Sequence, residues 1–111
     1  MQLIESELNG ASIISVEEER VDAHNAEVLK QHLASAFAGG AKKVVVNLAA
    51  VRFIDSSGLG ALVSGFKNAS TQQASLRLCG LHTQVRSMFE LTRLHRVFDI
   101  YETIDEASSA S

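Results

Sequence analysis

The sequence is short of several residue types and patterns, and each shortage excludes a class of protein. Its single cysteine, Cys79, excludes a disulfide framework within the chain and a cysteine-based zinc site. It has 10 lysines and arginines against 13 aspartates and glutamates, with no basic cluster of the kind that binds DNA or RNA. The longest apolar runs, Val44–Val46 and Leu59–Val63, are far too short to span a membrane. We therefore expect neither nucleic acid nor membrane among its partners.

The sequence does contain enough apolar material for one folded domain. Hydrophobic residues make up 46% of the 111 positions and charged residues 21%, as in globular chains and unlike disordered ones. No stretch is left over for a second domain, so residues 1–111 are predicted to be a single domain. Residues 1–9 lack the basic and apolar regions of a signal peptide. A cytoplasmic location is the expectation.

The N-terminal part predicts a β-hairpin. Asn9-Gly10 separates two apolar-bearing runs, residues 2–8 and 11–16, and both turn residues tolerate a positive φ. We expect a strand, a tight turn and a second strand. The charged run that follows, residues 17–20, is interpreted as a solvated loop.

Two amphipathic helices are predicted next, with a buried strand, residues 44–48, between them. Asp22 stands where the N-cap of the first helix belongs, and Gly39-Gly40 supplies its C-terminal stop. Its apolar residues at helical spacing are Ala26, Leu29, Leu33 and Phe37. The second helix follows Asp55 and runs to about Ser70. Its apolar stripe is predicted to be Leu59, Leu62, Val63 and Phe66.

The C-terminal part predicts two further strands, residues 76–79 and 97–101, and two further helices. Thr83 is placed to cap the third helix. Thr103 and Glu106 form a capping box that opens a short last helix, and residues 107–111 are expected to fray. Strands that alternate with helices predict an α/β fold with parallel neighbours, to which the hairpin adds an antiparallel strand. We expect a mixed sheet of about five strands with about four helices.

The segment from Asp55 to Gly60 is the strongest candidate for a functional site. It joins a buried strand region to a helix start, where backbone N–H groups are unpaired and the helix dipole is positive. A hydroxyl there is well placed to carry a phosphate or to lie beside one. The alternative is structural, because Asp55, Ser56 or Ser57 would serve equally well as a simple helix cap.

Two features of this helix favour function. Gly58, Gly60 and Gly65 each cost roughly 0.8–1 kcal/mol relative to alanine in a helix interior, which suggests close approach by another backbone. The side opposite the apolar stripe carries only small, uncharged residues, where an exposed helix usually has lysine or glutamate. These residues are Ser57, Ala61, Ser64 and Asn68. We interpret this side, with Gly60, as a docking surface; the alternative is that another part of the chain covers it.

Sequence motifs that are typical of catalytic sites are weak or missing. Residues 58–63 read G-x-G-x-x-V, but no acidic residue for a ribose follows about twenty residues later, and no P-loop or G-x-S-x-G motif is present. The four histidines lack H-x-x-x-H spacing, so no metal site is predicted. Cys79 is interpreted as a core residue. The favoured hypothesis is a binding module without catalysis. The weaker alternative is a small nucleotide-binding enzyme that uses the turn at Asp55.

The stretch from Val44 to Gly60, and above all Asp55-Ser56-Ser57-Gly58-Leu59-Gly60, resembles the signature of the STAS domain. It is most similar to the bacterial anti-sigma factor antagonists, and residues 21–26 and 91–98 resemble other family segments. The resemblance implies a small sheet with helices largely on one side. It also implies partners and no cofactor: the unphosphorylated protein binds an anti-sigma factor that is a serine kinase, and this frees the sigma factor. A phosphoserine phosphatase reverses the modification.

The resemblance also implies roles for individual residues. The phosphorylated residue is the one directly after the aspartate, Ser56. Its supporting residues are Asp55, Ser57, Gly58 and, on the same rim, Asp22. The family often has glycine where this chain has Glu19. A phosphate on Ser56 adds about −1.5 to −2 charges, which we expect the helix N–H groups to tolerate and a docked partner not to tolerate. A further alternative is a STAS subunit of a transporter or of another signalling assembly.

Overall fold

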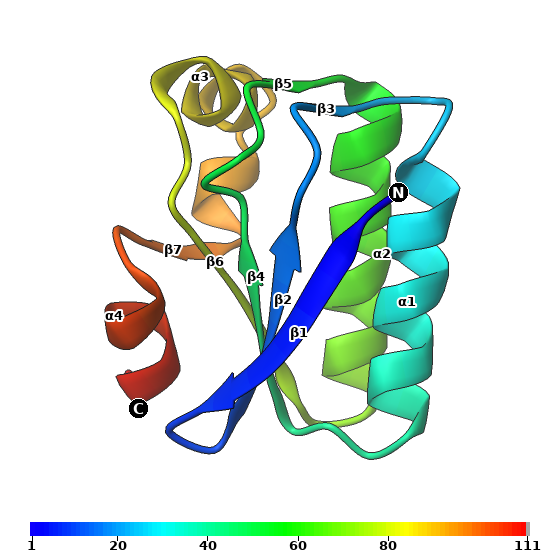
Figure 1. Ribbon diagram of the computed structural model, residues 1–111, viewed down its shortest axis with the longest axis vertical. Helices are drawn as coiled ribbons and strands as arrows, with labels where there is room; N and C mark the ends of the chain where they lie inside the picture. The colour runs from blue at the N-terminus through cyan, green and yellow to red at the C-terminus, as the bar shows by residue number, and fades with distance from the viewer. Residues whose placement is uncertain (111) are drawn as a thin grey trace.

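A computed structural model describes residues 1–110, which form a central sheet of five strands in the order β1-β2-β4-β6-β7, covered by helices (Figure 1). The strands of this sheet are β1 (Leu3–Leu8), β2 (Ala11–Val16), β4 (Lys43–Asn47), β6 (Ser75–Cys79) and β7 (Asp99–Tyr101). β1 pairs with β2 in antiparallel orientation, and every other pair is parallel. The predicted mixed sheet is confirmed.

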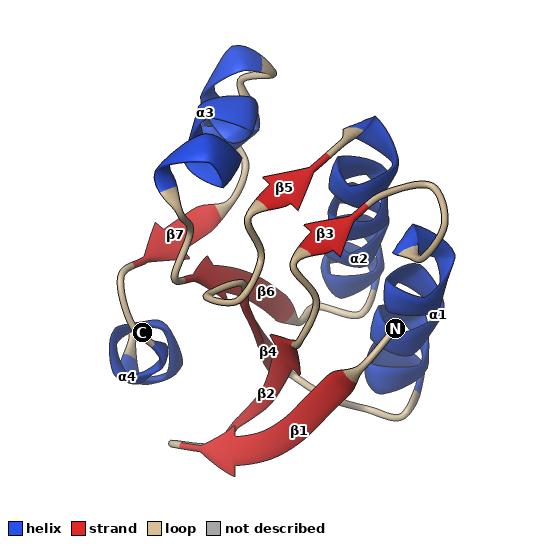
Figure 2. Ribbon diagram, turned by 45° about the horizontal axis from the view of Figure 1, so that its top comes forward, coloured by secondary structure: helices blue, strands red, loops and turns tan. Residues whose placement is uncertain are grey.

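Two short strands stand apart from the central sheet. β3 (Arg20–Val21) pairs in parallel with β5 (Phe53–Ile54), at the end of the molecule where the parallel strands finish (Figure 2). The charged run 17–20 was expected to be a loop throughout, and this is wrong for Arg20. β5 leads directly into the second helix, so this small pair fixes the position at which that helix begins.

Residues 1–110 contain four α-helices and one short 3-10 helix. These are α1 (Ala26–Ala38), α2 (Ser56–Thr71), α3 (Thr83–Leu91), η1 (Leu94–Arg96) and α4 (Ile104–Ser109). α1 and α2 lie side by side on one face of the sheet, and α4 lies on the other (Figures 1 and 2). The last strand begins at Asp99 rather than Val97, because residues 94–97 close a turn in which the Val97 N–H donates to the Leu94 carbonyl at 2.9 Å.

The hairpin turn between β1 and β2 is as predicted. Asn9 and Gly10 both have a positive φ, 53° and 78°, and Leu8 pairs directly with Ala11. This is the backbone that lets a two-residue turn follow the right-handed twist of the strands.

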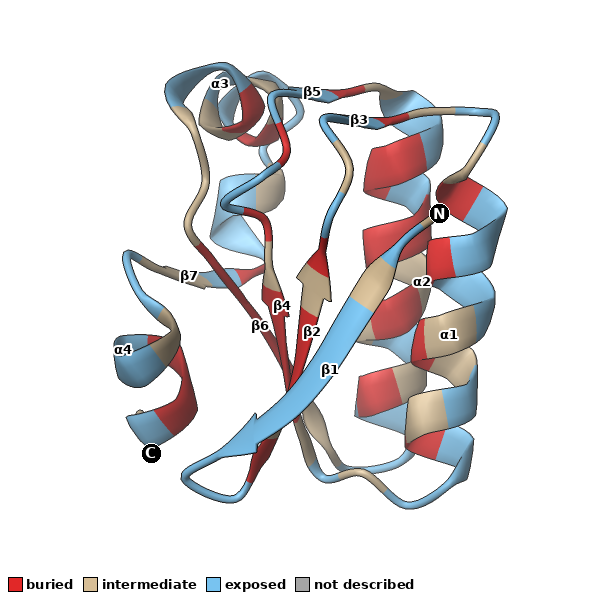
Figure 3. Cartoon of the chain, viewed as in Figure 1, coloured by how far each residue is buried: buried red, intermediate tan, exposed pale blue. Residues whose placement is uncertain are grey.

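The main core lies between the sheet and α1 with α2, and the inward sides of these elements are buried (Figure 3). The four predicted apolar residues of α1 are all buried, and so is the whole of Val44–Val46. On α2, Leu59 and Leu62 are buried, but Val63 and Phe66 are only half-buried. The buried side of α2 is therefore rotated from the predicted stripe and consists of Gly58, Leu59, Ala61, Leu62, Gly65 and Ala69.

A second, smaller core lies beneath α4. Ala107 and Ser108 are fully buried there, so the expectation that the tail frays is wrong for residues 107–110; residue 111 lies outside the described part. The cause is Arg77, only 7% exposed, whose guanidinium donates to the carbonyls of Ala107 at 2.9 Å and Ala110 at 2.7 Å. These hydrogen bonds hold the end of α4 on the sheet.

Helix capping differs from the prediction at two of the three named positions. Asp22 does not cap α1: it opens a preceding turn, with its carbonyl accepting from Ala26 at 2.8 Å, and Asn25 occupies the N-cap. Thr83 is the first residue of α3, after His82 at the N-cap. The capping box of Thr103 and Glu106 is confirmed.

Candidate functional site

The candidate site begins at the N-terminus of α2, where Asp55 is the N-cap. One oxygen of its carboxylate, Oδ1, accepts hydrogen bonds from the backbone N–H groups of Ser57 at 2.9 Å and Gly58 at 3.1 Å. Asp55 therefore caps the helix, and its part in supporting the phosphorylation site stays a prediction. Ser56 and Ser57 do not fill the cap position, and both are exposed in the first turn.

The pairing of β3 with β5 brings Asp22 to the same rim as Asp55. Val21 is paired with Ile54, and the two aspartates follow these residues; the Asp55 N–H donates to the Val21 carbonyl at 3.2 Å. Arg20 lies beside them, with its Nε 3.6 Å from Oδ2 of Asp22. This placement agrees with the one that the resemblance implied for Asp22, whose part in orienting the site stays a prediction.

Sequence reasoning missed Arg20 and Phe53. The guanidinium carbon of Arg20 lies 4.1 Å from the centre of the Phe53 ring, within range of a cation–π interaction. Phe53 is 42% exposed and lies three residues before Ser56. The two residues belong to two-residue strands, which show no hydrophobic periodicity in the sequence.

The space around the three glycines of α2 differs, and so does the structural reason for a glycine at each position. A Cβ on Gly58 would lie 2.8 Å from the Val21 carbonyl oxygen and 2.6 Å from the side chain of Ile54, so the β3 backbone presses against the helix start. A Cβ on Gly65 would lie 2.8 Å from Leu33 of α1. Packing within the chain thus explains two of the glycines. A Cβ on Gly60 would meet nothing within 4 Å, so nothing in residues 1–110 requires a glycine there.

The predicted docking surface of α2 is only partly exposed. Ser57 and Gly60 are exposed, whereas Ser64 and Asn68 are half-buried. Ala61 is 3% exposed, so its predicted place on the outer side is wrong. α1 packs along α2 and covers part of this side, which is one of the alternatives that helical spacing left open.

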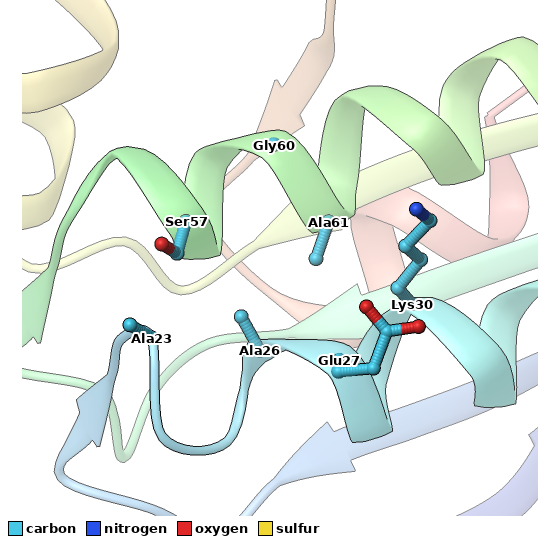
Figure 4. A pocket seen from close by; sticks show the side chains of 7 residues that line it. All are labelled: Ala23, Ala26, Glu27, Lys30, Ser57, Gly60 and Ala61. Atoms are coloured by element: carbon cyan, nitrogen blue, oxygen red, sulfur yellow. The ribbon is translucent and has the colours of Figure 1, made fainter.

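An open hollow of about 330 Å³ lies between α1 and α2 (Figure 4). One of the residues that line it, Ser57, directly follows Ser56 in the sequence. The α2 side of the hollow is formed by Ser57, Gly60 and Ala61. The other side is formed by Ala23, which precedes α1, and by Ala26, Glu27 and Lys30 of α1. The hollow is lined mostly by small residues, with one acidic and one basic side chain on α1.

Chemically reactive groups are not gathered at this site. Cys79 is fully buried, as the sequence indicated, and burial raises the pKa of its thiol to about 11. Among residues 1–110 there is no group of three or more histidine, cysteine, aspartate or glutamate side chains arranged to hold a metal ion. Nor does any helix in that range have the length and apolar character needed to cross a membrane.

Comparison with known proteins gives consistent matches along the chain. The family model for the STAS domain matches residues 4–107. The anti-sigma-B factor antagonist of Bacillus subtilis is 34% identical over 80 residues, which cover 72% of each chain. The crystal structure of an anti-sigma factor antagonist from Mycobacterium paratuberculosis superposes with a TM-score of 0.84 at 25% identity, over 96% of this chain and 89% of that one. The phosphorylated form of Bacillus SpoIIAA, at 19% identity, shares the fold, with a TM-score of 0.71 over 96% of both chains.

Proposed function

The chain belongs to the STAS domain family, and on that basis we propose that it is an anti-sigma factor antagonist controlled by phosphorylation of Ser56. The unphosphorylated protein binds an anti-sigma factor that is also a serine kinase, and the sigma factor is thereby released. Phosphorylation of Ser56 ends this binding, and a phosphoserine phosphatase restores it. The observation that carries the proposal is an exposed Ser56 in the first turn of α2, on a rim that already holds two aspartates.

The geometry of Asp55 gives the phosphate a strong effect on a partner. We expect the N–H groups of the helix to tolerate the phosphate, although the Asp55 carboxylate already accepts from two of them. A phosphate on Ser56 would therefore be compensated only in part, and it would add about −1.5 to −2 charges beside an existing anion. A partner surface in contact with it would have to bury unpaired charge, which is strongly unfavourable. The switch is a local block, with no change of fold.

We propose that the partner binds at the hollow between α1 and α2. Ser57 and Gly60 form the exposed part of the docking surface, and Ser64 and Asn68 extend it along α2. Gly60 supports this placement, because the chain itself gives no packing reason for a glycine there. A glycine at that point allows the backbone of a partner to come close. Since sigma factors act on transcription, the proposed function places the protein in the cytoplasm.

Three variants test the switch. The kinase is isolated by co-purification with the wild-type protein from its native cells, and the phosphate is mapped by mass spectrometry. Ser56→Ala should bind this kinase and incorporate no phosphate. Ser56→Asp should bind about tenfold more weakly or worse, while its melting temperature stays close to that of the wild type. Ser57→Ala is the matched control and should still be phosphorylated.

Other results of these experiments would overturn part of the proposal or favour a different function. Phosphate on Ser57 would overturn the assignment to Ser56, and an unfolded Ser56→Asp would overturn the local block. Turnover of ATP by the purified protein without a kinase would favour the small enzyme. A stable complex that contains no anti-sigma factor and ignores both Ser56 variants would favour a structural STAS subunit.

A further inference from the structure

The end of α3 and the turn after it form a surface corner that the proposed function does not use. We call residues 86–97 the α3–η1 corner. Leu91 is 79% exposed, the highest value for any large hydrophobic side chain in residues 1–110, and Val97 is 44% exposed. Leu91 ends α3 and Val97 follows η1, and two successive turns join them, closed by hydrogen bonds from the Arg93 N–H to the Glu90 carbonyl and from the Val97 N–H to the Leu94 carbonyl.

The corner is basic, although the chain as a whole carries a net charge of −3. It contains Arg86, Arg93 and Arg96, with Glu90 as its acidic side chain, while Asp99 follows two residues beyond the end. Neither ion pair that the structure shows within residues 1–110 involves any of these three arginines. Arginine is enriched at the surfaces where proteins bind one another, so arginines without an ion-pair partner favour binding of a protein partner here.

Arg93 has a backbone conformation that its residue type disfavours. Its φ is 63° and its ψ is 14°, in the left-handed region where glycine is the least strained residue. The side chain is exposed, and no hydrogen bond or ion pair holds it in the described part of the chain. The turn therefore needs the conformation but gives no structural reason for an arginine. Arg93 directly follows the C-cap of α3, a position where helices commonly end in the left-handed conformation, so its exposed side chain is available to a partner.

We propose that the α3–η1 corner is a docking surface for an acidic segment of a partner protein. Carboxylates of the segment pair with Arg93 and Arg96, and an aliphatic side chain of the segment packs between Leu91 and Val97. The charge of the corner selects the class of partner, because a segment rich in carboxylates is the complement of unpaired arginines. The surface acts independently of Ser56, so a protein held at this corner can stay bound when the phosphate on Ser56 releases another.

The experiment titrates the full chain, labelled with ¹⁵N, with a short synthetic peptide in which glutamates flank two leucines. The control peptide has glutamine at every glutamate. The glutamate peptide should give saturable amide shifts confined to residues 86–97 and their direct contacts, and these should weaken as salt is raised. The glutamine peptide should give none. Ser56→Asp should bind the peptide as the wild type does, which separates this proposal from the proposed function.

Arg93→Gly is the decisive variant, because it relieves the left-handed strain and removes the charge together. It should melt no lower than the wild type, yet bind the peptide about threefold to fivefold more weakly. Arg93→Lys should retain most of the binding. Arg52→Gln, which removes another exposed arginine, is the matched control and should leave binding unchanged.

Any of four results would overturn the proposal. These are shifts outside the corner, equal shifts with the glutamine peptide, unchanged binding by Arg93→Gly, and a short single-stranded oligonucleotide that binds the corner as well as the peptide does.

Discussion

The carboxylate of Asp55 accepts a hydrogen bond from the backbone N–H of Ser57 at 2.9 Å, directly beside the hydroxyl proposed to carry the phosphate. Asp55 thus stabilises the helix, and it also takes up the N–H groups of Ser57 and Gly58 that would otherwise be available to bind an anion. The stability of α2 and the strength of the switch are consequently linked through the same side chain.

Replacing Asp55 should separate its hydrogen bonds from its charge. Asp55→Ala removes the acceptor for the N–H groups of Ser57 and Gly58 and should lower the free energy of unfolding by about 1 kcal/mol. Asp55→Asn keeps an acceptor oxygen in the same position and should retain most of that stability. Urea denaturation of both variants measures the difference. Equal losses in the two variants would contradict a role based on hydrogen bonding.

Gly58 and Gly60 lie two residues apart on α2 and should respond to alanine in opposite ways. Gly58→Ala forces a methyl group against the Val21 carbonyl and should destabilise the fold by about 1–3 kcal/mol. Gly60→Ala meets open space and should stabilise it by about 0.5–1 kcal/mol.

The same pair also tests the docking surface. Thermal unfolding measures stability, and binding of the co-purified kinase is measured for each variant that folds. Gly60→Ala should bind more weakly although it is more stable, because its methyl group enters the space assigned to the partner. If Gly60→Ala bound as tightly as the wild type, Gly60 would not belong to the docking surface.

Local patterns in the sequence predicted most of the elements. Asn9-Gly10 has one favoured use, a two-residue hairpin turn, and the structure contains it. The apolar spacing of α1 determines which side of that helix is buried, and the unbroken Val44–Val46 run predicts a strand buried on both faces. The existence of α2 followed from its period in the same way.

The features that the sequence did not predict depend on contacts between distant residues. Ala61 looked exposed because helical spacing identifies a polar side without showing whether a second helix covers it. β3 and β5 are too short to have a period. Arg77 buries its charge by binding carbonyls 30 and 33 residues away, which no local pattern encodes. The choice of Ser56 over Ser57 rests on resemblance, since both hydroxyl-bearing residues are exposed.

Arg77 should be the strongest single support of α4. Arg77→Met removes the donor to the carbonyls of Ala107 and Ala110 and leaves the first of them buried without a partner. We expect a loss of about 2–3 kcal/mol in the free energy of unfolding, measured in urea. Hydrogen exchange should show α4 opening first. Lys43→Met, which removes a single bond to the Ser108 carbonyl, is the matched control and should lose less. A loss spread evenly over the whole sheet, with α4 no less protected than before, would contradict this role.

Cys79 should be protected from thiol reagents in the native state, and its titration should lower stability at high pH. Burial raises the pKa of its thiol from 9.0 to about 11, so the folded protein holds the proton more tightly than the unfolded chain does. As pH rises from about 9 towards 11, the unfolded chain loses that proton first, and the free energy of unfolding falls. Iodoacetamide at pH 8 should modify the native protein far more slowly than the protein in urea, because the thiolate is the reacting form.

Other groups also titrate in this range, so the contribution of the thiol has to be isolated by comparison. Cys79→Ala lacks the thiol, and the difference in the free energy of unfolding between it and the wild type should stay constant below pH 9. Between pH 9 and about 11 the wild type should lose stability relative to the variant, in line with the raised pKa of Cys79. A difference that stayed flat up to pH 11, together with rapid labelling of the native protein, would mean that the thiol titrates as it does in the unfolded chain and that the second core beneath α4 opens readily to solvent.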